Sequence, residues 1–473
     1  MDKISLPTFI ASLTCLLFIL AGSLISLNRY WQYESFFYDF GIFDQAIWKV
    51  AHFAPPIIDH LVVGGKWIFA DHFNPSIFLL SPLYWLSDKR EVLLVAQAII
   101  VGLSGFVLYL IGTVLLKNRF HALAILVTYF SFAGLQNAVI TDFHEATLAT
   151  LPLMVAYLSL VKKQFRWFWV MLVIFLGFKE SNYLVGLGIG ISIYFINRSY
   201  LKLAIATCIV SLLWGYISIS HIIPYFSGGF YQYQQDISLN PIQVASTFFD
   251  NEIKIRTLFV SFLNFGFLPI FSYPFYLLMF QDFLVRFYPP FAYTRWGIGL
   301  HYSALLAGIM GIASIFSIKF LQAKILKKQI LNFIALALIA NSLFLYRFVL
   351  HGSFGLSYNP TFYEHSKDFK FLNDLVNKIP SDSTVMAQNN LAVRFTHQEV
   401  YVLQSNPGKY KPDFYTQKVP EYIVIDGRPG QNPNNYFLIE DINYLLETLK
   451  QDPNYEIFYQ TSEQFIFKKK IRI

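Results

Sequence analysis

Long apolar runs separated by short polar segments dominate the first 350 residues. A first run extends from Leu6 to Leu27. Ten more follow, at 92 to 116, 120 to 140, 146 to 161, 167 to 178, 181 to 197, 201 to 223, 256 to 269, 270 to 284, 303 to 321 and 330 to 350. A transmembrane helix needs about 20 mainly apolar residues, because the hydrocarbon core is ~30 Å thick. The pattern predicts about eleven transmembrane helices, the four shortest being tilted or half-buried.

Basic and acidic residues fall on opposite sides of this predicted arrangement. If the N-terminus is cytoplasmic, the segments on that side carry a single acid, Asp2, and the basic residues Lys3, Lys117, Arg119, Lys162, Lys163, Arg166, Arg198, Lys202, Lys319, Lys324, Lys327 and Lys328. All other acids before residue 350 lie on the opposite side. Because cytoplasmic loops are enriched in Lys and Arg, we expect a multi-pass plasma-membrane protein with an extracytoplasmic C-terminus.

The chain changes character after residue 350, where it becomes polar and rich in Asn, Asp, Lys and Pro. Helical patterns occur at 364 to 378 and 438 to 451, and strand patterns at 399 to 404, 421 to 426, 455 to 460 and 463 to 470. The expected fold is therefore an all-α polytopic membrane domain (1–350), with a long first extracytoplasmic loop (29–91). A small soluble α/β domain of four strands (351–473) follows and suits a cap or recognition role.

Composition supports the membrane class and narrows the partners. Hydrophobic residues make up 55% of the chain and charged residues 14%, and the mean hydropathy is +0.46, unlike a soluble protein of this length. The net charge of +7 lies in short clusters between apolar runs, so a nucleic-acid partner is not expected. Cys15 and Cys208 both lie inside apolar runs, which indicates neither a disulfide framework nor a thiolate metal site.

The long first loop carries the first candidate site residues. Phe40, Phe43 and Ile47 recur at helical spacing, which predicts a helix lying on the membrane surface with Asp39 near its start. Asp39 is either a site residue or a helix cap, and Asp44 either a site residue or part of a solvated face. Farther along, Asp71 and His72 precede the turn signal Asn74-Pro75. This pair is either a helix cap or part of a site.

Two further segments place ionisable residues beside apolar runs. Asp142, His144 and Glu145 share the short turn DFHE, and Lys179 and Glu180 interrupt the apolar stretch from 167 to 196. The simpler interpretation of Lys179 and Glu180 is a water-exposed hairpin tip. Because charges at a membrane boundary are costly unless solvated or paired, both segments are also candidates for a shared cleft.

This predicted cleft combines carboxylates, histidines and cations. A partly desolvated carboxylate can act as a general base, and His with Asp or Glu can bind a divalent metal ion, so both roles stay open. Arg286, Arg295, His301 and Tyr302 lie on the predicted outside loop 285 to 302. They are either ordinary interfacial residues or ligands of an anionic group such as a phosphate.

Taken in order, the motifs YDFGIFDQAIW, DHFNP with SPLYWL, DFHE, FKES and HYSALL resemble those of an uncharacterised family of bacterial and archaeal predicted membrane proteins. That family in turn resembles the GT-C superfamily, whose glycosyltransferases use polyprenyl-phosphate-linked sugars. The resemblance implies that Asp39 is the catalytic base. It also implies that Asp44, Asp71, His72, Asp142, His144, Glu145 and Glu180 shape the sugar or metal site, and that Lys179, Arg295, His301 and Tyr302 bind the phosphate.

The implied function is transfer of a sugar from a lipid-linked donor to an unspecified acceptor on the extracytoplasmic face. The expected partners are the lipid-linked donor and the membrane lipids. Phe40 follows Asp39 where several GT-C branches have an Asp-Glu pair, which leaves the metal requirement open. A membrane transporter or lipid flippase is the main alternative, but it should carry polar groups near the middle of its spans, which are nearly free of charge here. A non-catalytic envelope protein is a third possibility.

Overall fold

The computed structural model describes residues 5–60, 67–233, 240–288, 292–324, 327–403, 419–435 and 439–470. The chain forms two compact units. Unit 1 comprises Met1–Ser26, His72–Ile77 and Leu94–Tyr358. Unit 2 comprises Leu27–Asp71, Phe78–Leu93 and Asn359–Ile473. Each unit therefore combines segments that are far apart in the sequence.

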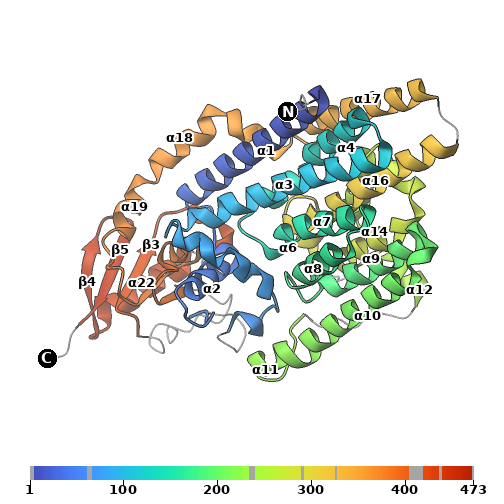
Figure 1. Ribbon diagram of the computed structural model, residues 1–473. Coiled ribbons are helices and arrows are strands. Elements are labelled where there is room, and N and C mark those ends of the chain that lie inside the picture. The colour runs from blue at the N-terminus through green and yellow to red at the C-terminus, as the bar shows by residue number, and fades with distance from the viewer. Residues whose placement is uncertain are drawn as a thin grey trace. The chain divides into compact units, whose positions relative to one another are not determined.

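The described residues of unit 1 form helices joined by turns and loops (Figure 1). Its helices are α1 (Leu6–Trp31, within this unit to Ser26), α3 (Glu91–Leu116, from Leu94), α4 (Arg119–Ser131), α5 (Ala133–Ile140), α6 (Glu145–Leu148), α7 (Thr150–Val161), α8 (Phe165–Leu176), α9 (Asn182–Ile196), α10 (Leu201–Ile217), α11 (Ile223–Ser227), α12 (Pro241–Ser246), α13 (Glu252–Asn264), α14 (Tyr276–Phe287), α15 (Tyr293–Trp296), α16 (Ala304–Lys324) and α17 (Lys328–Phe344). Short 3-10 or π-helical turns extend several of them, including η8 (His301–Ser303) before α16.

Among the described residues, five helical stretches are long and apolar enough to cross a membrane, namely Leu6–Trp31, Glu91–Leu116, Arg198–Ser227, His301–Lys324 and Lys328–Val349. Helices α4 and α5 form a sixth candidate that is bent by 55°. The predicted count of eleven spans is not confirmed. The predicted runs between 146 and 197 form helices of 10 to 17 residues, and a helix that short rises less than the ~30 Å of the hydrocarbon core.

Close contacts fix the packing of the long helices in unit 1. A Cβ atom at Gly102 of α3 would lie 2.3 Å from Cγ1 of Ile19, so only glycine allows α1 to approach α3 this closely. At one end of the unit, His121 Nε2 lies 2.9 Å from Asn332 Oδ1, which joins the first turns of α4 and α17. Gln322 Nε2 near the end of α16 donates to the Leu116 carbonyl of α3 at 3.5 Å.

The same end of unit 1 carries basic side chains. Lys117 lies between α3 and α4 and Arg119 begins α4, while Lys324 and Lys328 lie at the end of α16 and the start of α17. All four are exposed. The contacts of His121 and Gln322 therefore place a group of cations at one end of the helices.

Unit 2 contains a sheet and the helices around it. Its helical elements are η1 (Phe37–Gly41), α2 (Ile42–Ala51), η2 (Ile68–Ala70), most of η3 (Pro75–Trp85), α18 (Pro360–Asp368), α19 (Lys370–Val376), α20 (Asn389–Ala392), η11 (Val393–Phe395), η12 (Pro433–Asn435) and α22 (Ile439–Gln451). Its strands are β1 (Val385–Gln388), β2 (Val400–Leu403), β3 (Tyr422–Asp426), β4 (Tyr455–Gln460) and β5 (Gln464–Lys469).

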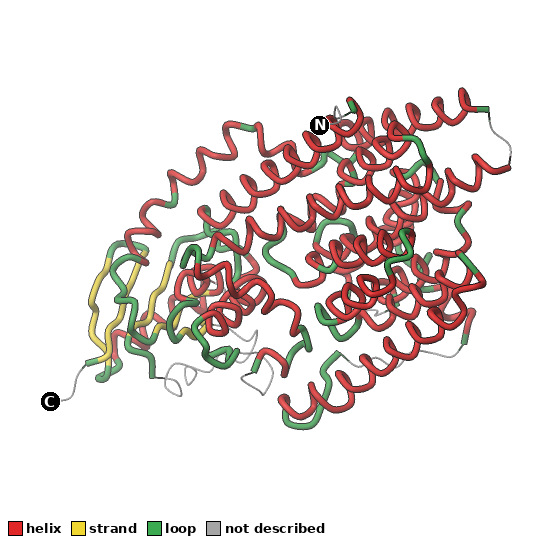
Figure 2. The backbone as a smooth tube through the Cα atoms, viewed as in Figure 1, coloured by secondary structure: helices red, strands yellow, loops and turns green. Residues whose placement is uncertain are grey.

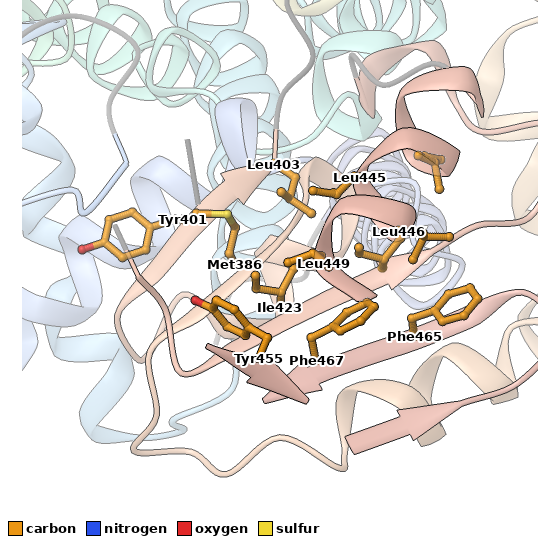
Figure 3. Packing of buried hydrophobic residues seen from close by; sticks show 12 residues of the cluster. Met386, Tyr401, Leu403, Ile423, Leu445, Leu446, Leu449, Tyr455, Phe465 and Phe467 are labelled. Carbon is orange, nitrogen blue, oxygen red and sulfur yellow. The ribbon is translucent and has the colours of Figure 1, made fainter. Parts of the chain in front are cut away.

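The five strands form one sheet in the order β2-β1-β3-β5-β4, drawn in yellow in Figure 2. Strand β1 pairs in parallel with β2 and β3, and β5 pairs antiparallel with β3 and β4. Leucines of α22, among them Leu445 and Leu449, pack onto one face of the sheet against Ile423 and Phe467 (Figure 3). Burial of these side chains supplies the apolar core of the domain.

The sheet confirms the strand predictions for the tail, with one addition. The predicted strands at 399 to 404 and 421 to 426 and the closing hairpin are β2, β3, β4 and β5, although residue 404 lies outside the described residues. The fifth strand, β1 (VMAQ), was not predicted; unlike β2 (VYVL), it has a single β-branched residue and no aromatic residue. The predicted helix at 364 to 378 is divided into α18 and α19, and that at 438 to 451 is α22, whose described part begins at Ile439.

The predicted helix of the first loop is present as η1 followed directly by α2. Its apolar residues Phe40, Phe43 and Ile47 are buried inside the protein, at 0%, 7% and 0% exposure. The expectation that they lie on the membrane surface is therefore wrong. Helical spacing of apolar residues indicates a buried face, but it does not distinguish burial in lipid from burial in protein.

Candidate functional site

Unit 1 brings two of the sequence motifs into direct contact. The segment 72–77 lies along the linker between α8 and α9, where the Ser76 N–H donates to the Gly177 carbonyl at 2.8 Å. A Cβ atom at position 177 would lie 2.2 Å from Ser76 Oγ. Glycine at this position therefore allows the DHFNP motif to approach the FKES motif.

Glu180 is the centre of this contact and is fully buried. Its Oε1 lies 2.9 Å from His72 Nδ1 and accepts a hydrogen bond of 2.9 Å from the Tyr231 hydroxyl, and its Oε2 accepts from the Phe73 N–H at 3.2 Å. The ring of Tyr233 stacks on His72 with 4.5 Å between centroids. The interpretation of Glu180 as a water-exposed hairpin tip is therefore wrong.

These partners keep Glu180 ionised. Burial alone would raise the pKa of Glu180, but the charge and hydrogen bond of His72, followed by the charge of Lys179, lower it to about 2. The carboxylate is thus a stable acceptor that orients the His72 ring.

Lys179 connects this group to the DFHE motif. Its Nζ lies 2.7 Å from Oε1 of Glu145, and the two side chains are 22% and 2% exposed. Burial would lower the pKa of Lys179, but the charges of Glu145 and Glu180 raise it overall. The result is a buried ion pair adjacent to the His72–Glu180 pair.

The other members of the DFHE motif lie in the turn between α5 and α6. Gln97 of α3 holds this turn, because its Nε2 donates to the Asp142 carbonyl at 2.7 Å and its Oε1 accepts from the His144 N–H at 2.9 Å. Asp142 is buried and has a positive φ of 45°, a conformation that Asp tolerates better than most residues. The His144 ring stacks on the ring of His301, with 3.5 Å between centroids.

His301 belongs to a second group, which also contains Tyr302 and the cation Arg295. Its ring lies 4.0 Å from that of Tyr302, and the guanidinium of Arg295 lies 5.8 Å from the Tyr302 ring. Electrostatic interactions connect His301 with Lys179, Arg295 and Arg286. The described part of unit 1 therefore brings together His72, His144, Glu145, Lys179, Glu180, Arg295, His301 and Tyr302 in one connected cluster, with Asp142 in its supporting turn.

Arg286 of α14 fixes the segment that carries Arg295. Its Nε donates to the Arg295 carbonyl at 2.9 Å and its Nη2 to the Gly297 carbonyl at 2.8 Å, while Asp282 lies 3.5 Å from Nη1. Arg295 itself has no carboxylate within salt-bridge distance among the described residues. Arg286 is thus a structural anchor, and Arg295 is the cation available to an anionic ligand.

The remaining candidates, Asp39, Asp44 and Asp71, belong to unit 2. From Phe36 to Ile47 every residue is buried except Tyr38 and Asp39. Asp39 lies within η1, whose N-cap is Phe36, so it is not the cap of this helix. Asp71 is partly exposed and follows η2.

Asp44 is 0% exposed and surrounded by donors, so the alternative of a solvated face is wrong. Its carboxylate accepts hydrogen bonds from the Tyr84 and Thr396 hydroxyls, and His397 Nε2 lies 3.2 Å from Oδ2. Burial would raise the pKa of Asp44, but His397, Arg90 and the hydrogen bond from Thr396 lower it overall.

Sequence patterns did not identify Tyr231, Tyr233, Thr396 or His397. Tyr231 and Tyr233 lie in the polar aromatic segment FYQYQQ that follows Gly228 and Gly229, and this interruption of the apolar pattern was a usable signal. Thr396 and His397 offered no such signal, because they contact Asp44 from a distant part of the chain. Thr396 lies 352 residues from Asp44 in the sequence.

The predicted divalent metal is not supported by a ligand group in the described residues. Across these ranges, no set of three or more His, Cys, Asp or Glu side chains is arranged to hold a metal ion. The metal remains a prediction.

The long apolar helices, together with a charged cluster at the ends of several of them, define a multi-pass α-helical membrane protein with a small α/β sheet. The chain belongs to the family described as predicted membrane protein (DUF2079), whose family model matches residues 29–466. Membership confirms the membrane-protein part of the sequence-based expectation, and the link to GT-C enzymes remains a prediction. No curated protein shows significant similarity to the chain.

Proposed function

We propose that this protein is an integral-membrane glycosyltransferase that moves a sugar from a polyprenyl-phosphate-linked donor to an acceptor on the extracytoplasmic face. The observation that carries the proposal is the cationic side of the unit 1 cluster. Arg295 has no carboxylate partner among the described residues, and His301, Tyr302 and Lys179 accompany it. A guanidinium near a phenol, in a cluster that also contains a lysine, suits a phosphate group.

The distribution of basic residues along unit 1 supports the proposed sidedness. Helices α6 and α7 run from Glu145 to Val161, which Lys162 and Lys163 follow, and η8 and α16 run from His301 to Lys324. Helix α9 follows Glu180 and ends before Arg198. The cluster therefore lies at the opposite helix ends from these cations, and a basic end is typical of the cytoplasmic side.

Asp39 is the proposed base, as the resemblance to GT-C enzymes implies. Asp39 and Tyr38 are half-buried, whereas the other residues from Phe36 to Ile47 are buried, and partial exposure suits a carboxylate that must reach a substrate. Glu180 is a poorer base, because a carboxylate with a pKa of about 2 holds a proton weakly.

In the proposed reaction, the Asp39 carboxylate takes the proton of an acceptor hydroxyl. The hydroxyl oxygen then forms a bond to the anomeric carbon of the sugar. The bond between that carbon and the phosphate oxygen breaks, and its electron pair leaves with the polyprenyl phosphate. The charge of the leaving phosphate needs a cation, and the resemblance to GT-C enzymes assigns that role to Lys179 and Arg295.

The proposal is tested with Asp39→Asn in purified protein reconstituted into liposomes with radiolabelled polyprenyl-phosphate sugars. Release of polyprenyl phosphate is measured with water or added sugars as acceptor. We expect a loss of about 100-fold or more, because a general base contributes roughly 10²–10⁴-fold. Asp88→Asn is the matched control, since Asp88 is an exposed acid of the same loop.

Unchanged release in Asp39→Asn would exclude Asp39 as the base. If the wild-type protein released no polyprenyl phosphate from any donor but moved labelled lipid between leaflets, a flippase would replace the proposed transferase. Lys179→Met and Arg295→Met should mainly weaken donor binding, which separates the phosphate ligands from the base.

A further inference from the structure

The turn that carries Asp39 is held by the C-terminal part of unit 2. On one side, the Tyr38 N–H donates to Oδ1 of Asn389 at 3.2 Å. On the other side, Asp44 of α2 accepts from the Thr396 hydroxyl and lies next to His397. The segment Asn389–His397 thus contacts the residue before Asp39 and the residue five positions after it.

Asn389 is fixed in orientation by two opposite hydrogen bonds. It is 1% exposed, and its Nδ2 donates to the Asn434 carbonyl at 2.6 Å while its Oδ1 accepts from Tyr38. The side chain of Tyr38 is held as well, because its hydroxyl lies 2.9 Å from His60 Nε2. Both the backbone and the side chain of Tyr38 are therefore constrained next to Asp39.

Asp44 is also held by a chain of hydrogen bonds that begins at the residue directly before helix α3. Arg90, which precedes α3, donates from Nε to Thr396 Oγ1 at 2.7 Å, and Thr396 in turn donates to Asp44. Arg90 Nε also lies 3.8 Å from Asp44 Oδ2. Asp44 and Thr396 are both 0% exposed. A buried carboxylate with these partners is costly to move, because any lost bond leaves an unpaired charge in the interior.

These contacts have no evident role in binding a substrate, since Asp44 is inaccessible and its donors are engaged. They do determine where η1 and α2 lie within unit 2. The helix between the two contact points contains Asp39, and it is continuous, because Gly41 and Ile42 at the junction of η1 and α2 both have helical backbone angles. Movement at Asp44 would therefore be transmitted to Asp39.

We propose that the segment Asn389–His397 positions Asp39, with Thr396 and His397 acting through Asp44 and Asn389 acting through Tyr38. The inference rests on the proposed function, because it assigns to this segment a part in the activity of Asp39. It gives the C-terminal sheet domain a positioning role in catalysis, in place of the cap or recognition role expected from the sequence.

The test compares Thr396→Val with Thr396→Ser, since serine keeps the hydroxyl that binds Asp44 and valine removes it. In the donor-release assay, Thr396→Val should lower kcat by about 10- to 100-fold at an unchanged KM, because small displacements of a catalytic group have effects of that order. Thr396→Ser should restore most of the rate. Thr448→Val, which removes an exposed hydroxyl from α22, is the matched control.

Wild-type kcat in Thr396→Val, or an equal loss in Thr396→Ser, would overturn the positioning role. If Thr396→Val is not recovered as folded protein, His397→Gln replaces it with the same expectation. His397→Gln with wild-type kcat would then overturn the inference.

A second measurement does not depend on sugar transfer. Asp39→Cys is labelled with a maleimide in a background where Cys15 and Cys208 are replaced by serine, with and without Thr396→Val. We expect about tenfold faster labelling with Thr396→Val. Loss of a hydrogen bond to a buried charge should raise the population of the locally opened state by about that factor. An unchanged labelling rate would refute the positioning role. Absence of sugar transfer by the wild type, with the expected labelling, would refute only the proposed function.

Discussion

At the scale of single residues, Glu180 makes unit 1 sensitive to acid. Its pKa is lowered from 4.5 to about 2, so its partners stabilise the folded state only while the carboxylate is charged. This stabilisation is complete above about pH 5 and is lost as the pH falls towards 2. It amounts to about 3 kcal/mol, since one pKa unit corresponds to ~1.4 kcal/mol.

The measurement is thermal unfolding in detergent of the wild type and Glu180→Gln from pH 7 to pH 3. We expect the wild type to have the higher Tm at pH 7 and the difference to shrink steadily as the pH is lowered. A difference in Tm that stays constant, or grows in acid, would contradict the assignment of Glu180 as a charged partner of His72.

The Lys179–Glu145 pair predicts strong coupling between two substitutions. Lys179→Met alone leaves Glu145, 2% exposed, without its counter-ion and should destabilise the protein by about 3 kcal/mol or more. The double variant Lys179→Met/Glu145→Gln should be less destabilised than this single variant, because no charge remains unpaired. Chemical unfolding of all four proteins completes the cycle, and simple additivity would show that the pair is not coupled.

The sequence indicated which ionisable residues belong to the candidate site better than it indicated which residues they contact. Glu145, Lys179 and Glu180 were recognisable because charged residues are rare beside apolar runs. Their pairing was not recognisable, because the sequence does not show whether Lys179 pairs with Glu145 or with the neighbouring Glu180. Asp44 shows the same limit, because its buried environment depends on Tyr84 and on Thr396 of the distant tail.

At the scale of elements, strands were predicted better than spans. The strands β2, β3, β4 and β5 carry runs of apolar or aromatic residues bounded by polar segments, which is a local signal. Hydropathy identified the apolar helices but not their lengths or bends. The bend of 55° between α4 and α5 occurs at Phe132, a residue that no helix-breaking rule would single out.

At the scale of the whole chain, the topology can be tested with reporters fused after residues 119 and 350. The contact between His121 and Asn332 places the starts of α4 and α17 at one end of unit 1. The candidate span Lys328–Val349 has 22 residues and rises about 33 Å from there. We therefore expect a cytoplasmic reporter after residue 119 and an extracytoplasmic one after residue 350, and the same location for both would refute the proposed sidedness.

The shortness of α8 would affect any lipid that covers its apolar surface. This helix of 12 residues rises only about 18 Å, yet Trp167, Val170 and Val173 expose apolar side chains along it. Acyl chains that cover this surface would have to shorten or tilt, since the undisturbed hydrocarbon layer is ~30 Å thick. The bilayer would then be thinned beside the helix that leads to Lys179, which would lower the barrier to bringing the polar headgroup of a long-chain lipid inward at that point.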